Sequence, residues 1–443
     1  MMNNSLAKQY SMGSLFRFAL PNMVMMLCLS LYTVVDGAFV ARLIGTTALS
    51  AVNMVYPVIN VQLAIAIMLA TGGNAIIAKR LGEQKVDRAR ALFSFLVAVE
   101  LLAGIVFAVA GLLFIDPLLG MLGATEAQYE LSRTYLGILF IFAPFFFLQT
   151  AFQTFFVTAG VPSLGLAVTI AGGLTNVFLD YLFMKPLAMG VAGAALATGI
   201  GYILVAVIGI LYFAAFRDKP LYFVKPSSEK GFLFHTCTNG SSEMVTNFAN
   251  AVTTFLFNYT FLTFYGEDGV AAITIALYFE FLFTAVYFGY ANGIAPIASY
   301  KYGEENHREL KSLFRSSVII IAVASVIGFM VSQAGISEIL TIFTPKESHV
   351  YQIVRQGFWQ YAFAFLFMGF NIFASAWFTA LSNGRVSAVI SFSRTFVFLV
   401  GAILLLPIPF KEMGAWLAIP SAECLGILIS IYYVIKYKKV YHY

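Results

Sequence analysis

The sequence carries little charge. Asp, Glu, Lys and Arg make up 11% of the 443 residues, whereas 60% are hydrophobic, and the mean hydropathy is +0.86. Soluble domains carry about 25% charged residues. The composition therefore excludes a soluble globular protein and predicts a polytopic membrane protein with the lipid bilayer as its partner.

Cysteine and nucleotide-binding motifs are also scarce. The three cysteines, Cys28, Cys237 and Cys424, stand alone inside apolar runs and suggest neither a disulfide framework nor a metal site. The sequence contains no Walker A pattern, so direct use of ATP is not expected. The net charge of +5 comes from basic residues in short loops, which does not indicate nucleic-acid binding.

Apolar windows of ~20–25 residues, separated by polar turns, predict an all-α protein with about twelve transmembrane helices. We expect six spans in the first half, at residues 16–42, 49–78, 91–115, 131–158, 164–184 and 191–215. Six more follow at residues 232–265, 270–298, 313–333, 354–380, 386–407 and 413–436. This predicts an N-lobe at residues 1–216, a cytoplasmic linker at 217–231 and a C-lobe at 232–443.

The charges of the loops predict the orientation. Lys and Arg gather after the second, sixth and eighth spans and in the C-terminal tail, whereas the opposite loops are mainly acidic. The positive-inside rule then places both termini in the cytoplasm of a multi-pass protein of the cell (plasma) membrane. An even number of spans agrees with this orientation.

The two halves repeat. Gly45 and Gly266 are separated by 266 − 45 = 221 positions, and the same offset pairs Gly82-Glu83 with Gly303-Glu304. Six spans per half give both halves the same orientation, so an axis along the membrane normal relates them. Parallel repeats of this kind are typical of transporters with a binding cavity between the halves and alternating access by rocking.

Four polar residues fall at a similar depth inside predicted spans. They are Asp36 in the first span, Asn176 and Asp180 one turn apart in the fifth, and Thr198 in the sixth. A carboxylate inside a span is costly without a partner or a cavity, so it marks a functional site. Hard oxygen ligands suit Na⁺, and two nearby carboxylates suit proton uptake equally well. The alternative is structural, with local hydroxyls such as that of Tyr32 satisfying the aspartates.

Three segments resemble the multidrug and toxic compound extrusion (MATE) family, in its DinF-like and MepA-like bacterial branch. They are LFRFALPNMV…YTVVDGAFVARLIGTTALSAV near the N-terminus, RLGEQKVDRAR after the second span, and NVFLDYLFMKPLAMGVAGAALAT across the fifth and sixth. The resemblance covers nearly all of the chain. It implies twelve helices in two parallel six-helix repeats, arranged as a V around a central cavity. It also implies export of bulky, often cationic compounds, coupled to inward flow of Na⁺ or H⁺.

The resemblance also implies roles for particular residues. The family's cation-coupling site falls on Asp36, Asn176, Asp180 and Thr198, where Na⁺ is a possible ligand, and its bent first helix falls on Pro21. The repeat does not copy the two aspartates, because positions 257 and 401 hold Phe and Gly. Coupling is therefore expected in the N-lobe alone.

The second half has membrane acids of its own. We expect Arg394 and Glu423 to form a structural pair, and we assign Glu243 and Glu280, together with Tyr32, to the substrate cavity. Acids there would attract cationic drugs. Aromatic side chains could add a drug surface by stacking and cation–π attraction, namely Phe145, Phe146, Phe147, Tyr278, Phe279 and Tyr287.

The leading interpretation is a secondary active antiporter for amphipathic or cationic organic compounds, working as a monomer with no cofactor beyond its coupling ion. The alternative is a flippase for a lipid-linked precursor, although related families of that kind tend to have a basic cavity and here the acids outnumber Arg394. A passive channel would need polar stripes that are not evident. An intramembrane aspartyl protease needs a GxGD context, which VVDG and FLDY do not supply, so no enzyme is expected.

Overall fold

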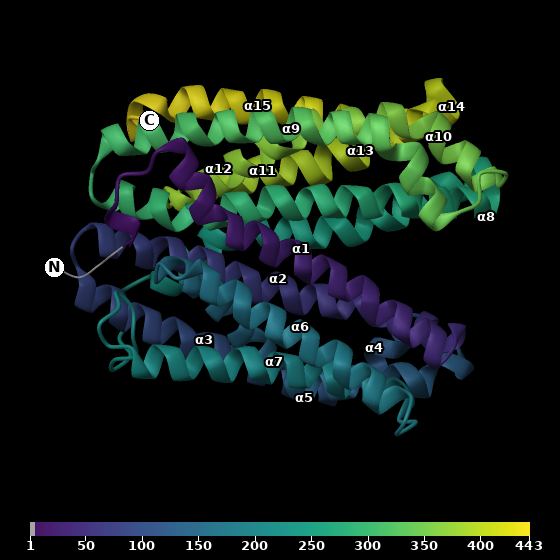
Figure 1. The fold of residues 1–443 in the computed structure, drawn as a ribbon, viewed down its shortest axis with the longest axis horizontal. Helices are drawn as coiled ribbons and strands as arrows, with labels where there is room; N and C mark the ends of the chain where they lie inside the picture. The colour runs from purple at the N-terminus through teal and green to yellow at the C-terminus, as the bar shows by residue number, and fades with distance from the viewer. Residues whose placement is uncertain (1–4) are drawn as a thin grey trace.

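The computed structural model describes residues 5–443, apart from a few side chains inside helices, and its regular structure over this range is helical throughout (Figure 1). A short 3₁₀ turn at Ser5–Ala7 precedes the first half. The helices of that half are α1 (Met12–Leu43), α2 (Thr46–Gly82), α3 (Val86–Leu113), the short α4 (Ile115–Met121), α5 (Glu126–Thr158), α6 (Pro162–Met184) and α7 (Gly190–Ala215).

The second half is more interrupted. Its helices are α8 (Phe232–Gly303), α9 (His307–Phe343), α10 (His349–Tyr361), α11 (Phe365–Ala380), α12 (Gly384–Phe392), α13 (Leu399–Leu405), α14 (Pro407–Trp416) and α15 (Ala418–Tyr441). A 3₁₀ turn at Ala362–Ala364 separates α10 from α11, and a π-helical turn at Ser393–Phe398 separates α12 from α13.

The prediction of twelve spans is confirmed. In the described part of the chain, eleven helices are long and apolar enough to cross a membrane, and the 72-residue α8 contains two spans. Its two arms fold back on each other at Gly266, where φ is 65° and ψ is −150° (Figure 1). Gly45, the partner of Gly266 in the repeat, has φ 125° between α1 and α2. Side chains with a Cβ avoid these conformations, which explains why both positions are glycine.

The tenth to twelfth spans differ from the continuous helices expected there. The tenth consists of α10 and α11 with the 3₁₀ turn between them, and the eleventh contains the π-helical turn. The twelfth begins at α15, after α14, in which Lys411 has a non-helical φ of 50°. A π-turn adds a residue to the ladder and turns the side chains that follow it, and here it carries Arg394, which is paired with Glu423.

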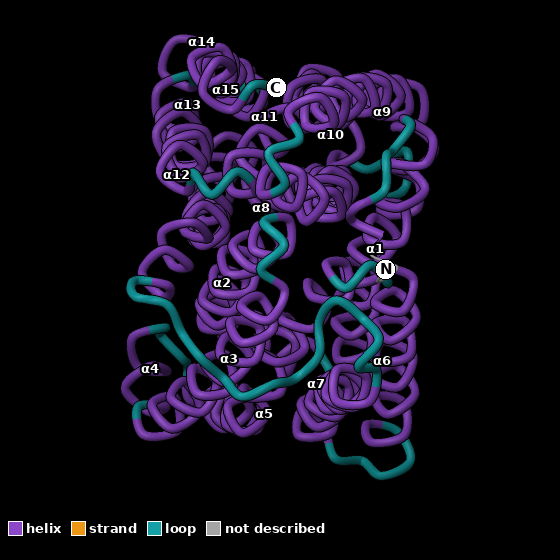
Figure 2. The backbone as a smooth tube through the Cα atoms, turned by 90° about the vertical axis from the view of Figure 1, so that its left-hand side faces the viewer, coloured by secondary structure: helices purple, strands orange, loops and turns teal. Residues whose placement is uncertain are grey.

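Helices α1–α7 form one group and α8–α15 the other, and the two meet where α1 and α2 pack against α8 (Figures 1 and 2). The groups lie close together at the end that carries both termini and further apart at the opposite end, as in a V (Figure 1).

The contact between the groups follows the repeat. A Cβ added to Gly82 would lie 2.0 Å from the carbonyl oxygen of Tyr300, and one added to Gly303 would lie 2.1 Å from that of Lys79. Both residues of the first pair map onto the second by the offset of 221 seen in the sequence. A second pair of contacts has the same symmetry. Gly72 packs against Gly240, and Gly293, which the offset relates to Gly72, packs against Ala19. Glycine permits this close approach because it has no side chain.

Ion pairs tie the connecting segment to the first half at the same end. Glu229 accepts hydrogen bonds from Arg80 at 2.6 Å and from Arg88 at 2.7 Å. On the other side, Lys301 donates to the carbonyl oxygen of Ala7 at 2.9 Å. The segment before α1 therefore contacts the second span of the second half, through Lys301. The segment before α8 likewise contacts the second span of the first half, through Arg80.

Candidate functional site

The four residues predicted to couple ions come together inside the first half. Asp36 lies on α1, Asn176 and Asp180 on α6 and Thr198 on α7, and all four are buried. Helix α6 contacts both α1 and α7, and the i, i+4 spacing points Asn176 and Asp180 to one face. Asn176 Nδ2 donates to Thr198 Oγ1 at 3.3 Å. The carboxyl groups of Asp36 and Asp180 are close enough for one, when protonated, to donate to the other.

Several oxygens of this group receive no hydrogen bond from the described residues. They are Oδ1 of Asp36, Oδ1 of Asn176 and both carboxyl oxygens of Asp180. Buried polar atoms are normally hydrogen-bonded, and an exception needs an explanation, such as a functional role or a bound water or ion. Among the described residues, no hydroxyl group donates to these four atoms, as the structural alternative would require. A cation or a shared proton would satisfy them.

A narrow cavity of about 20 Å³ borders the group. This volume holds about one water or one small ion. Its lining includes Asn176 and Thr198 of the predicted set, and also Tyr32, which therefore lines the interior of the first half. Gln149 and Gln153 add polar atoms from α5.

Aromatic hydroxyls surround the aspartates. Tyr32, Tyr56, Tyr135 and Tyr202 all lie near enough to Asp36 to interact with its charge. Apart from Tyr32, sequence reasoning missed them, and it missed the two glutamines as well. The chain contains 23 tyrosines, and which of them face the aspartates depends on how each helix is rotated about its own axis, which only the structure shows.

Pro21 lies inside α1, and the helix continues on both sides of it. One residue later, Asn22 Nδ2 donates to the carbonyl oxygen of Gly289 in α8 at 2.7 Å. Helix α1 therefore has Asp36 near its C-terminal end, and near its N-terminal end it is hydrogen-bonded to the second half through Asn22.

The second half contains a separate polar network, and its predicted ion pair is confirmed. Arg394 Nη1 lies 3.2 Å from Glu423 Oε1. Asn371 Nδ2 donates to Glu423 Oε2 at 2.7 Å, and Ser430 donates to Asn371 Oδ1 at 2.8 Å.

The two acids that were assigned to the substrate cavity, Glu243 and Glu280, lie near this network. Glu280 accepts a hydrogen bond from the hydroxyl of Tyr361, and Glu243 is 4% exposed. Both interact electrostatically with Arg394.

Most of the predicted aromatic surface is packed in the interior. Phe146, Phe147, Phe279 and Tyr287 are buried in the hydrophobic core, so the expectation that they form a drug surface is not supported. Only Tyr278 of this set is largely exposed, at 45%, and it interacts with Tyr56 across the two halves.

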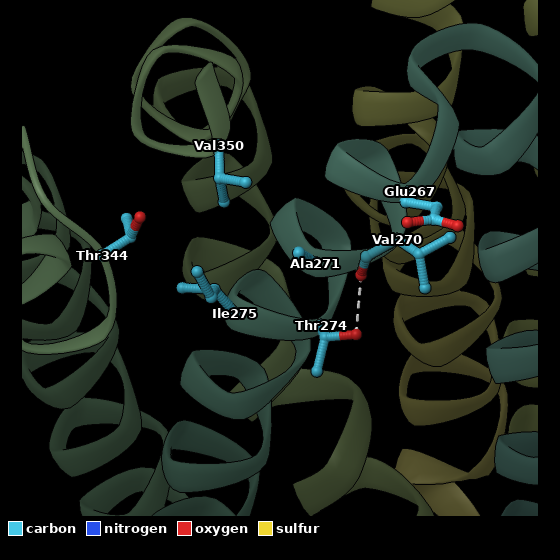
Figure 3. A pocket seen from close by; sticks show the side chains of 7 residues that line it. All are labelled: Glu267, Val270, Ala271, Thr274, Ile275, Thr344 and Val350. Carbon is cyan, nitrogen blue, oxygen red and sulfur yellow. Dashed lines mark hydrogen bonds between the residues drawn. The ribbon is translucent and has the colours of Figure 1, made fainter. Parts of the chain in front are cut away.

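A second pocket, of about 600 Å³, lies elsewhere. It is an open depression at the end of the molecule away from the termini, between the second arm of α8 and the segment that joins α9 to α10 (Figure 3). Among the described residues that line it, Glu267 is the only charged one, and none of them belongs to the predicted site.

Comparison with known families gives one match in each half. The MatE family model matches residues 21–182 and again residues 243–404. Multidrug export protein MepA from Staphylococcus saprophyticus is 24% identical over 321 residues, which cover 71% of this chain and 70% of that protein. MepA from Staphylococcus aureus strain RF122 is 23% identical over 317 residues, covering 71% and 69%.

Solved structures share the fold. The outward-facing conformation of a multidrug resistance MATE transporter of the MOP superfamily superposes with a TM-score of 0.93 at 21% identity, covering 100% of this chain and 99% of that one. A MOP superfamily transporter from Pyrococcus furiosus, described as having a binding pocket of reversed polarity, gives 0.91 at 21% identity, covering 99% and 98%.

Proposed function

Because the chain belongs to the MatE family of membrane transporters, we propose that it is a secondary active multidrug exporter. It antiports amphipathic or cationic organic compounds against Na⁺ or H⁺ by alternating access. The relatives named above as multidrug export proteins support this class of cargo. The observation that carries the proposal is the buried Asp36–Asp180 pair, in which Oδ1 of Asp36 and both carboxyl oxygens of Asp180 receive no hydrogen bond from the described residues.

In this proposal the aspartates hold the coupling ion. A Na⁺ ion would take oxygens of Asp36, Asn176 and Asp180, with the hydroxyl of Thr198 at the edge of the cavity. A proton would instead be shared between the two carboxyl groups. Either species removes the repulsion between two like charges in a medium where water screens them little.

Coupling follows from the two contacts of α1. Neutralising the pair lets Asp36 approach Asp180, which draws that end of α1 towards α6. Nearer its start, α1 is joined to α8 by the hydrogen bond from Asn22 to Gly289. Pro21 removes one helical hydrogen bond beside this contact, which makes a bend there less costly. Ion binding in the first half can therefore alter its contact with the second.

The remaining assignments belong to the same proposal. The N-lobe at residues 1–216 and the C-lobe at 232–443 rock about the linker at 217–231. Glu243, Glu280 and Tyr32 contribute to substrate binding. A single chain is the working unit, placed in the plasma membrane with both termini in the cytoplasm. The flippase alternative gains nothing from Arg394, because Glu423 already neutralises that side chain.

Dye efflux from reconstituted vesicles tests the proposal. Wild type, Asp36→Asn and Asp180→Asn are compared for ethidium efflux under an imposed Na⁺ gradient and, separately, under an imposed pH gradient. Efflux should fall to background in both variants, and the gradient that drives the wild type identifies the ion. Asp116→Asn is the matched control, because Asp116 is an exposed acid in the short helix α4 that pairs with Arg133 of α5, away from the buried aspartates. Persistent gradient-driven efflux in both aspartate variants would refute the site, and no efflux by the wild type would refute the transport class.

A further inference from the structure

We propose that Arg394 is a tethered cation that fills the second half's copy of the ion cavity. Only the first half would then exchange a cation. The corresponding site in the second half is permanently occupied by a guanidinium group of the chain itself. This inference rests on the proposed ion site of the first half for its comparison, but its first test, the binding of a free cation, probes the second half without any transport assay.

The polar pocket around Arg394 and the cavity of the first half occupy equivalent positions in the repeat. Removing the offset of 221 maps Arg394 onto position 173 and Glu423 onto position 202, which hold Gly173 and Tyr202. Both of these residues line the cavity of the first half. Asn371 maps onto position 150, next to Gln149, which also lines it. The same three spans of each half therefore supply the residues around the pocket.

The two pockets differ in what fills them. In the first half, glycine at position 173 adds no side chain, and a Cβ built there would meet nothing closer than Tyr32 at 4.0 Å. In the second half, the side chain at the matching position is arginine. Its Cγ lies 3.3 Å from where a Cβ of Gly426 would stand, and Asn371 Nδ2 lies 2.9 Å from the same point. Gly426 maps onto Val205, another lining residue of the first-half cavity. The volume is thus taken up by the guanidinium and its stem.

The surroundings of Arg394 are those of a cation site. Glu423 pairs with it directly at 3.2 Å, and Asn371 orients that carboxylate by a hydrogen bond of 2.7 Å. Glu243 and Glu280 add two further acids within electrostatic reach. Arg394 is 8% exposed and Glu423 6% exposed, so solvent screens the pair weakly. A cation tethered to the backbone cannot leave, which removes this half from ion exchange.

The inference predicts that the vacated pocket binds a free cation. Arg394→Ala removes the guanidinium and most of its stem while keeping Glu423 and Asn371. Ethylguanidinium replaces the lost atoms, so it should bind saturably at one equivalent per chain and raise the melting temperature of the purified variant. In wild type, and in the double variant Arg394→Ala/Glu423→Gln, it should do neither. The proposal would be overturned if Arg394→Ala showed no saturable binding of ethylguanidinium and no change in its melting temperature when the compound is added.

The measurement is repeated with Asp36→Asn in the background. If Arg394→Ala/Asp36→Asn still binds one equivalent of ethylguanidinium, the second-half site is independent of the first-half site. Failure of the proposed coupling site in the efflux assay would then leave this result intact. If Arg394→Ala binds ethylguanidinium but Arg394→Ala/Asp36→Asn does not, the compound binds in the first half and the inference is refuted.

A size-matched series keeps the test decisive if Arg394→Ala does not fold. Arg394→Lys retains a tethered cation, whereas Arg394→Met retains an apolar side chain of similar length. The proposal expects Arg394→Lys to reach the membrane and to transport ethidium within about threefold of wild type, and Arg394→Met to lose at least tenfold. Equal yield and transport for the two would show that Arg394 only fills space and would overturn the proposal.

Discussion

A single methyl group at Gly82 should weaken the closure of the molecule at the end that carries both termini. The Cβ of Gly82→Ala would stand 2.0 Å from the carbonyl oxygen of Tyr300 and 2.9 Å from the amide nitrogen of Glu304. An ordinary carbon–oxygen contact is about 3.3 Å, so α2 and α8 must separate by about 1.3 Å. The obstructing atoms are backbone and cannot rotate aside.

The energetic size of this effect follows from packing. Forcing a methyl group into a tight contact costs about 1–3 kcal/mol. If the open conformation is free of the clash, the equilibrium shifts towards it by a factor of about 5 to 150. Gly303→Ala should act in the same direction, because its Cβ would stand 2.1 Å from the carbonyl oxygen of Lys79.

Electron–electron double resonance measures the separation. Spin labels at Asp87 and Arg308, which are exposed and related by the repeat, report the distance between the starts of α3 and α9. Both glycine variants should populate longer distances than wild type. Gly401→Ala is the control, because a Cβ there meets nothing within 4 Å. Distance distributions that match wild type in both variants, with unchanged melting temperatures, would refute the reasoning.

Two further predictions concern acidic residues. Burial alone would raise the pKa of Glu229, but its hydrogen bonds to Arg80 and Arg88 and their charges bring it below the ordinary value of 4.5. A carboxylate with a lowered pKa stabilises the fold above its unfolded-state pKa and loses that effect as pH falls through the folded one. The wild-type melting temperature should therefore fall below about pH 4.5, and Glu229→Gln should flatten that decline; identical pH profiles would contradict this. Glu100 is fully buried with neither carboxyl oxygen hydrogen-bonded by the described residues. A buried carboxyl group without a hydrogen-bond partner costs about 1–3 kcal/mol, so Glu100→Leu should raise the melting temperature by a few degrees, and a lower one would indicate an unseen partner.

Features that depend on composition could be predicted from the sequence. Long apolar runs indicated the spans, and the recurrence of glycine at a fixed offset indicated the repeat. Gly45 and Gly266 are the clearest case, because a backbone conformation with positive φ restricts the residue type strongly enough to leave a mark in the sequence. Asp36 and Asp180 stood out for a similar reason, since few charges occur inside apolar spans.

Features that depend on packing could not be predicted. The π-helical turn at Ser393–Phe398 has the same kind of composition as an α-helix, and its extra residue is visible only once Arg394 is seen against Glu423. The breaks in the tenth and twelfth spans are likewise decided by neighbouring helices. Gln149 and Tyr202 were missed because their role depends on the rotation of α5 and α7, which the many polar and aromatic residues of these spans do not fix.

The symmetric glycine contact has a consequence for how the protein can change over evolutionary time. Lys79 meets Gly303 as Tyr300 meets Gly82, which is the self-complementary pattern of an isologous dimer interface, here joined into one chain. A larger residue at either glycine disturbs the same seam, so both copies are constrained together. The interiors face no such constraint, because the pocket around Asp36 and the pocket around Arg394 lie in separate halves. The fused repeat therefore leaves the two pockets free to differ chemically, whereas the seam between the halves must keep its two-fold pattern.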